Sequence, residues 1–209
     1  MTIFSIKKSE FHSLDSLFFV ICQKLTQQKV KRMPLFQMTG LSGAGKSSIA
    51  NLLKERLLAM NLKVEIIDGD EFRKILCADL GFSKEDRIEN IKRLGFVANL
   101  LARNEIITII AAINPYNVAR SELKLRYDAK LIYVKCDVET LRKRDTKGLY
   151  ERAFLPENHP DKIHNLTGVN DTFEIPENPD LVIDTSEENL EESLEKVLNF
   201  ILQNNISKL

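Results

Sequence analysis

The sequence is poor in cysteine, contains no tryptophan and has no excess of charge of either sign. Its 3 cysteines, Cys22, Cys77 and Cys136, are widely spaced and odd in number, which argues against a disulfide framework or a zinc site. Basic and acidic residues number 30 each, so nothing indicates a nucleic-acid partner or a membrane surface. We therefore expect a chain that works in the reducing cytoplasm.

Long hydrophobic runs are also missing. The longest apolar run near the N-terminus, residues 17–22, is too short for a membrane span, and Glu10 and Asp15 before it are unlike a signal peptide. A hydrophobic content of 44% over 209 residues is still enough for a sizeable core. We expect one domain over residues 33–209, preceded by a leader over residues 1–32 that carries apolar residues at helical spacing.

A complete phosphate-binding motif is present. Residues 40–47 read GLSGAGKS and match the pattern GxxxxGK[ST] between a strand-like stretch and a helical one. In this motif the glycines let backbone N–H groups close around phosphates, Lys46 reaches the outer phosphates, and the Ser47 hydroxyl is placed to ligate Mg2+. The motif predicts a protein that uses a nucleoside triphosphate.

Short apolar segments alternate with helical patterns along the rest of the chain. We predict strands at residues 35–39, 64–68, 106–113, 131–134 and 181–183, and helices at residues 46–60, 83–104 and 187–202, with Ser83 capping the second helix. Nearly continuous apolar strands are typical of parallel sheets that are covered on both faces. The expected fold is therefore an α/β doubly wound domain of the P-loop NTPase type, with a five-stranded parallel sheet and helices on both faces.

Ligands of such folds bind at the carboxyl ends of the strands, so the residues that follow each strand are the candidate site residues. Asp68 and Asp70 flank a glycine after the second strand, where one carboxylate would organise Mg2+ and one would accept a proton. A plain turn with a helix cap is the alternative for these residues. After the fourth strand, Arg142, Arg144 and Lys147 form either a solvated helix face or a cation cluster for phosphoryl transfer.

Several blocks in order make residues 36–185 resemble the adenylylsulfate kinase family. They are GLSGAGKSS at 40–48, DGD at 68–70, LGFSKEDRIENIKRLG at 80–95, NPY at 114–116, RDTKGLY at 144–150, LTG at 166–168 and PENPDLVIDT at 176–185. The resemblance implies an enzyme that uses ATP with Mg2+ to phosphorylate the 3′-hydroxyl of adenosine 5′-phosphosulfate, in sulfate assimilation. It also implies a mobile lid over about residues 145–175, which would exclude water from the reacting phosphates.

The resemblance further implies roles for individual residues. Lys46, Asp68 and Asp70 would be catalytic, with Ser47 on the metal and Asp68 as either the base or the organiser of Mg2+. The residues that it assigns to ATP are Gly40, Leu41, Ser42, Gly43, Ala44, Gly45, Lys46, Ser47 and Ser48. Those that it assigns to the acceptor nucleotide are Asp70, Arg73, Phe82, Arg87, Asn90, Ile113, Asn114, Lys147 and Leu166, with Phe82 against the base, or else in the core under its turn.

Four departures from the family pattern lie on the acceptor side. Asn114 replaces a serine and Asn117 replaces a common arginine, while Leu166 stands where many members place an aromatic residue that stacks on the adenine. Compared with the family that the chain resembles, the stretch 151–165 makes the lid longer by about five residues. It contains His159 and His164, for which solvent exposure is the default expectation and a metal site the least favoured.

These departures leave alternatives open. The same chemistry on a cytidine conjugate such as cytidine diphosphoramidate, in a surface-polysaccharide pathway, would suit a pocket without the adenine-stacking aromatic. A non-catalytic nucleotide-binding module is the third alternative, disfavoured because Lys46, Ser47, Asp68 and Asp70 are all present. Resemblance to dimeric kinases, together with the apolar stripe of the leader, favours a homodimer.

Overall fold

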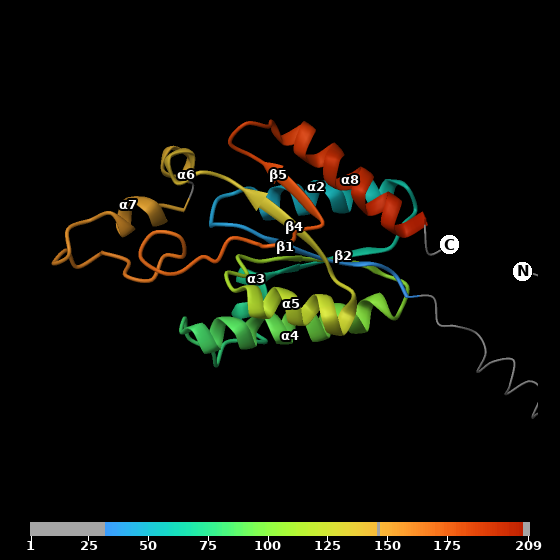
Figure 1. The fold of residues 1–209 in the computed structure, drawn as a ribbon, viewed down its shortest axis with the longest axis horizontal. Helices are drawn as coiled ribbons and strands as arrows, with labels where there is room; N and C mark the ends of the chain where they lie inside the picture. The colour runs from blue at the N-terminus through green and yellow to red at the C-terminus, as the bar shows by residue number, and fades with distance from the viewer. Residues whose placement is uncertain (1–31, 146, 207–209) are drawn as a thin grey trace, which may run out of the picture. The chain divides into compact units, whose positions relative to one another are not determined.

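The computed structural model describes residues 32–145 and 147–206, and these form one compact unit. The predicted leader helix lies in residues 1–32 and so falls almost wholly outside the described residues. The elements, labelled as in Figure 1, are β1 (Leu35–Thr39), α2 (Lys46–Ala59), β2 (Val64–Asp68), α3 (Gly69–Arg73), α4 (Lys84–Ala102), β3 (Ile107–Ala111), α5 (Asn117–Tyr127), β4 (Lys130–Lys135), α6 (Val138–Arg144), α7 (Leu149–Ala153), β5 (Leu181–Asp184) and α8 (Leu190–Ile206).

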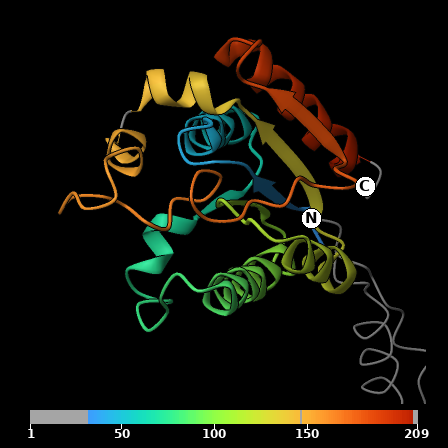
Figure 2. The same ribbon diagram turned by 60° about the vertical axis from the view of Figure 1, so that its left-hand side comes forward.

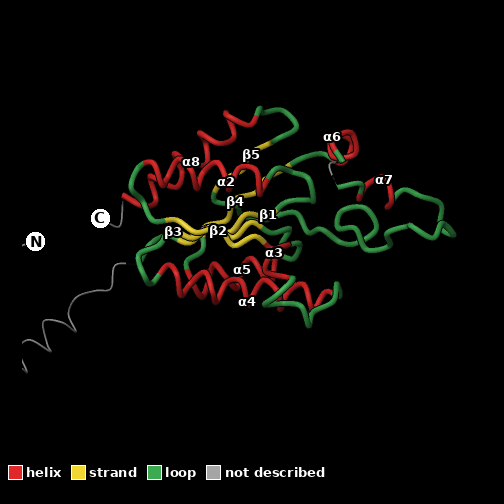
Figure 3. The backbone as a smooth tube through the Cα atoms, turned by 180° about the vertical axis from the view of Figure 1, so that it is seen from behind, coloured by secondary structure: helices red, strands yellow, loops and turns green. Residues whose placement is uncertain are grey.

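The five strands form one parallel sheet in the order β2-β3-β1-β4-β5, which confirms the predicted fold class. Helices α2 and α8 cover one face, and α4 and α5 cover the other (Figures 1 and 3). Strand β1 is central and every one of its residues is buried. Because all strands run the same way, their carboxyl ends meet along one edge, where the segment between α6 and β5 also lies (Figure 2).

Side chains alternate between the two faces along the central strands. Phe36 and Met38 of β1 pack with the α2 and α8 cluster, whereas Leu35 packs with the α4 and α5 cluster. By the same alternation Gln37 and Thr39 share the face of Leu35, and both are fully buried. The core on the α5 side therefore contains polar side chains that require internal hydrogen-bond partners.

The predicted element bounds agree with the structure except near the ends. Strands β1 and β2 have the predicted bounds, and the Ser83 hydroxyl accepts a hydrogen bond from the Asp86 N–H as the predicted cap of α4. Strand β3 is shorter than the predicted 106–113, because after Ala111 the backbone turns and the Ile113 carbonyl accepts from Gly40 N–H. Helix α8 begins later than predicted, at Leu190, because Asn189 and Glu192 form a reciprocal capping box.

Close packing of α4 on α5 depends on Gly95. A Cβ atom at this position would lie 2.9 Å from two carbon atoms of the Leu123 side chain, which is 1% exposed. Overpacking of this kind costs about 1–3 kcal/mol, whereas the better helix propensity of alanine returns about 1 kcal/mol.

We therefore predict that Gly95→Ala lowers the free energy of unfolding by about 1 kcal/mol, measured by urea denaturation. Arg103→Ala, an exposed position at the end of the same helix, is the control and changes stability by less than about 0.5 kcal/mol. A more stable Gly95→Ala protein would contradict this account of the helix contact.

Candidate active site

The phosphate loop connects β1 to the start of α2. Gly40 has φ 153°, and a Cβ atom there would lie 2.2 Å from the Val134 carbonyl oxygen of β4, so only glycine fits. Gly45 has φ 94° and precedes α2, whose first turn has neither a side-chain cap nor an acidic residue. The N–H groups and the positive end of the helix dipole at the start of α2 are therefore available to an anion.

Lys46 lies inside this loop. Its side chain is buried, and Nζ donates to the carbonyl oxygens of Gly40 at 2.8 Å and Leu41 at 2.7 Å. Burial lowers the pKa of Lys46 from 10.5 to about 8, although the nearby Asp70 carboxylate acts in the opposite direction. A phosphate group in the loop would favour the charged form of this lysine.

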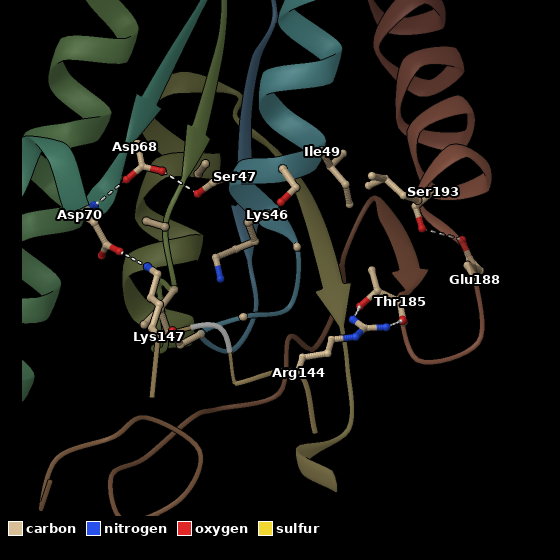
Figure 4. Close-up of a pocket in the computed structure, with 18 residues that line it drawn as sticks. Lys46, Ser47, Ile49, Asp68, Asp70, Arg144, Lys147, Thr185, Glu188 and Ser193 are labelled. Carbon is tan, nitrogen blue, oxygen red and sulfur yellow. Dashed lines mark hydrogen bonds and ion pairs between the residues drawn. The ribbon is translucent and has the colours of Figure 1, made fainter. Parts of the chain in front are cut away.

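Asp68 ends β2 and faces the phosphate loop, as Figure 4 shows. Its Oδ2 accepts a hydrogen bond of 2.6 Å from the Ser47 hydroxyl, while Oδ1 accepts the N–H groups of Asp70 at 2.9 Å and Glu71 at 3.3 Å. Asp68 is thus both the cap of α3 and a partner of the loop, so the cap alternative and the site prediction are compatible. Its carboxylate has a fixed orientation before any ligand binds.

Asp70 and Lys147 meet across the site. Lys147 Nζ lies 2.7 Å from Asp70 Oδ2, and both side chains are more than half exposed (Figure 4). Exposed ion pairs contribute only about 0–1 kcal/mol. The pair can therefore separate at little cost when ligands bind. Lys147 can then bind a phosphate oxygen, and the Asp70 carboxylate can accept a hydrogen bond from a hydroxyl group.

Two pockets adjoin at this place. The phosphate-loop pocket has a volume of about 460 Å³. It is lined by the phosphate loop, by Asp68, Asp70 and Lys147, and on the other side by residues between β5 and the start of α8. The Phe82 pocket, of about 340 Å³, is lined by Phe82, Arg73, Arg87, Asn90 and the turn after β3. The two pockets share Asp70, Ala112 and Ile113. A group bound in one pocket can therefore reach a group bound in the other.

Phe82 lies close to two cations that line the same pocket. It is 55% exposed, which shows that the alternative of a core residue is wrong. The guanidinium carbons of Arg73 and Arg87 lie 4.8 Å and 5.4 Å from its ring centroid. Burial, and next the charge of Arg87, lower the pKa of Arg73. Two guanidinium groups so placed favour an anionic ligand.

Arg87 is oriented by the segment that we predicted to be a lid. Its Nη2 lies 2.8 Å from the Asp171 carboxylate and donates to the Asn165 carbonyl at 3.0 Å, and its Nε donates to the Phe82 carbonyl at 2.9 Å. Within the described residues, Nη1 donates no hydrogen bond. Since Arg87 lines the Phe82 pocket, this nitrogen is left for a ligand.

Two asparagines complete the Phe82 pocket. Asn90 and Asn114 are buried, and within the part of the chain that the structure describes their Oδ1 atoms have no hydrogen-bond partner. Asn114 Nδ2 donates to Gln37 Oε1 at 3.1 Å. Unpaired buried oxygens are costly, so each is a candidate partner for a hydrogen-bond donor on a ligand or a water molecule.

Leu166 and Arg142 lie outside both pockets. Leu166 is 6% exposed, belongs to the core cluster on the α2 and α8 side, and lines neither pocket. The structure therefore does not bring it to the acceptor side. Of the predicted basic cluster, Arg144 and Lys147 line the phosphate-loop pocket, where Arg144 Nη2 donates to the Thr185 carbonyl at 2.6 Å. Arg142 lines neither pocket, and its guanidinium carbon lies 4.2 Å from the Phe154 ring centroid.

Several residues that line the site were not predicted from the sequence. Thr185, Glu188 and Ser193 line the far side of the phosphate-loop pocket, next to the predicted Arg144. Thr185 follows the last apolar strand, so the rule that ligands bind after strands would have found it. The exposed His164 pairs with Glu157 at 3.2 Å, and the described residues contain no metal-type cluster of His, Cys, Asp and Glu. None of the described helices is long and apolar enough to cross a membrane.

A phosphate loop on a five-stranded parallel sheet, with a second anion pocket at its edge, defines a P-loop kinase. The family model for adenylylsulphate kinase matches residues 33–184, and the chain belongs to this family. The adenylyl-sulfate kinase of Picosynechococcus sp. is 49% identical over 161 residues, which is 77% of this chain and 88% of that protein.

Two further relatives agree with this assignment. The adenylyl-sulfate kinase of Microcystis aeruginosa is 44% identical over 163 residues, covering 78% of this chain and 87% of that protein. Among solved structures, the APS kinase of Mycobacterium tuberculosis in complex with AMPPNP and APS superposes with a TM-score of 0.74 at 33% identity, covering 82% of this chain and 98% of that one.

The pKa of Lys46 gives a prediction for nucleotide binding. Since the free protein has this pKa at about 8 and a bound phosphate raises it, binding of MgATP at pH 8 takes up protons. The neutral lysine binds phosphate poorly, so the apparent Kd rises about tenfold from pH 7 to pH 9. Isothermal titration calorimetry in buffers of different ionisation enthalpy measures both effects.

Lys46→Met is expected to abolish the proton uptake. Lys54→Met, which removes an exposed partner of Glu65 on the same helix, is the control and leaves it unchanged. Heats that are independent of the buffer in the wild-type protein would show that Lys46 does not titrate as the structure indicates.

Proposed function

We propose that the chain is an ATP-dependent kinase that phosphorylates the 3′-hydroxyl of adenosine 5′-phosphosulfate to give 3′-phosphoadenosine 5′-phosphosulfate. The observation that carries the proposal is the junction of the phosphate-loop pocket and the Phe82 pocket at Asp70, Ala112 and Ile113. Membership of the adenylylsulphate kinase family and a structural neighbour solved with AMPPNP and APS support the same substrates.

In the proposed mechanism the phosphate-loop pocket holds ATP. The loop N–H groups and the start of α2 bind the β- and γ-phosphates, and Lys46 turns from the Gly40 and Leu41 carbonyls to the phosphates. Lys147 leaves Asp70 to contact the transferred phosphoryl group. These cations stabilise the charge that develops during in-line transfer.

The donor set fits Mg2+. The Ser47 hydroxyl and the Asp68 carboxylate are hard oxygen ligands that already lie 2.6 Å apart at the edge of the phosphate loop. They would hold the ion together with phosphate oxygens and water, as is usual for Mg2+ in kinases. When bound, the ion neutralises phosphate charge.

The Phe82 pocket would hold the acceptor. The base of the acceptor nucleotide would pack against the exposed Phe82 ring, and its 5′-phosphosulfate would contact Arg73 and Arg87 Nη1. The 3′-hydroxyl would then face the junction of the pockets. Asp68 or Asp70 accepts its proton as the oxygen bonds to the γ-phosphorus of ATP and ADP leaves.

The alternative acceptor, a cytidine conjugate, loses its main support. It rested on Leu166 in place of an adenine-stacking aromatic, and the structure buries Leu166 in the core. The named relatives are adenylyl-sulfate kinases. A homodimer stays a prediction from the sequence, and one structural neighbour is described as a hexameric APS kinase from Thiobacillus denitrificans.

A coupled ADP-release assay with MgATP and a panel of 5′-modified adenosine and cytidine nucleotides tests the acceptor. We expect turnover with adenosine 5′-phosphosulfate and a product phosphorylated at the 3′-oxygen, identified by mass spectrometry and phosphorus NMR. Turnover with a cytidine conjugate alone would replace the proposed acceptor and keep the chemistry. Absence of turnover with every nucleotide would favour a binding module.

The roles of Lys46 and Asp68 give a second prediction. Lys46→Ala and Asp68→Asn should each lower kcat by about 10²–10³-fold, because both groups act where charge develops. Glu71→Gln, a neighbouring exposed carboxylate that lines neither pocket, is the control with near wild-type kcat. The rate of phosphoryl transfer in each variant is measured by rapid quench. A near-normal transfer rate in Asp68→Asn would show that Asp68 is not the base and would leave Asp70 in that role.

A further inference from the structure

Arg120 of α5 is a fully buried arginine that the site described above does not use. It is 2% exposed, and the described part of the chain offers it no ion pair within 4 Å. All five of its N–H donors are nevertheless satisfied by neutral oxygens. Burial of a guanidinium is costly unless each donor has a partner, so this arrangement is a strong structural constraint.

The five hydrogen bonds join three segments of the chain. Nη1 donates to the Thr39 hydroxyl at 3.2 Å and the Asn114 carbonyl at 2.8 Å. Nε and Nη2 donate to Asn117 Oδ1 at 3.2 Å and 2.6 Å, and Nη2 also donates to the Glu174 carbonyl. Thr39 precedes the phosphate loop, Asn114 lines the Phe82 pocket, and Glu174 ends the predicted lid.

Further hydrogen bonds tie Glu174 to the start of α5. Glu174 N–H donates to the Pro115 carbonyl at 2.9 Å, and Glu174 Oε2 accepts the Asn117 N–H at 2.6 Å. Asn117 Nδ2 donates to the Ile175 carbonyl at 3.3 Å. Tyr116 provides no side-chain cap for α5, so the Glu174 carboxylate takes that place at the positive end of the helix.

We propose that Arg120, Asn117 and Glu174, which we call the Arg120 clamp, position the C-terminal end of the 145–175 segment against the turn at residues 114–116 during phosphoryl transfer. Arg120 is a positioning residue, since it touches neither pocket. Asn117 departs from the family pattern, and in this chain its Oδ1 atom accepts hydrogen bonds from two nitrogens of the Arg120 guanidinium. The clamp keeps the acceptor hydroxyl aligned and water excluded.

This inference rests on the proposed kinase activity, and its test uses the full chain. Asn117→Ala removes the oxygen that accepts two guanidinium donors, and Glu174→Ala removes the carboxylate that accepts the Asn117 N–H while it leaves the Glu174 carbonyl on Arg120. Both side chains are only half-buried. Arg120→Lys keeps the charge and loses the fork. We measure kcat and KM for both substrates, and the ratio of 3′-phosphorylated product to ADP. Measurements are made well below the melting temperature of each variant, determined by calorimetry.

We expect kcat/KM for the acceptor to fall about 10–100-fold in Asn117→Ala and Glu174→Ala, with KM for MgATP changed less than about twofold. The ratio of product to ADP should fall well below one, because water replaces a misaligned acceptor. A merely structural role would not move this ratio. Arg126→Ala, an exposed residue of α5 paired with Glu122, is the control and keeps the wild-type values.

Hydrogen exchange separates this proposal from the proposed function. In the presence of MgATP, amides of residues 147–175 should exchange faster in Asn117→Ala than in Arg126→Ala, whatever the acceptor is. A wild-type protein without kinase activity would overturn the proposed function, and the exchange result would still decide the clamp. Wild-type coupling and wild-type exchange in both Asn117→Ala and Glu174→Ala would overturn the clamp.

Discussion

The site depends on the close approach of the phosphate loop to strand β4 at Gly40. No side chain fits there, because a Cβ atom would lie 2.2 Å from the Val134 carbonyl oxygen. The same residue donates its N–H to the Ile113 carbonyl at 3.2 Å and accepts from Lys46 Nζ through its own carbonyl. Through these contacts one residue sets the relation of β1 to its two neighbouring strands and holds the lysine in place.

Charge in the site is balanced locally, although the chain as a whole has no net charge. Lys147 is held by Asp70, Arg87 by Asp171, and Lys46 by two carbonyl oxygens within the loop. The exposed Lys147–Asp70 pair is individually weak, whereas Arg87 and Lys46 are buried and need their protein partners when no ligand is bound. These contacts keep the cations oriented, and an anionic ligand can take the place of the protein partners when it binds.

Local patterns made much of the fold predictable. The apolar strands, the phosphate motif and the cap at Ser83 are determined by neighbours within a few residues, and these predictions agree with the structure. The parallel sheet followed from the alternation of strands and helices, which also placed Asp68 and Asp70 at the edge where strands end.

What could not be predicted depends on contacts between distant segments. A leucine in a lid motif gives no local sign that it lies in the core, as Leu166 does. The helix α5 was missed because it has no cap of its own and receives one from Glu174, 57 residues further along the chain. The role of Arg120 could not be predicted from the sequence, because its partners at positions 39, 114 and 174 come close to it only after folding.

The segment 145–175 touches both halves of the site, which gives the two substrates a means of influencing each other. Near its start, the Tyr150 hydroxyl donates to the Ser42 carbonyl of the phosphate loop at 2.8 Å. Near its end, Asp171 orients Arg87 of the Phe82 pocket. If a ligand in either pocket altered these contacts, the two pockets would be coupled through this segment, and each ligand would change the affinity of the other by the same factor.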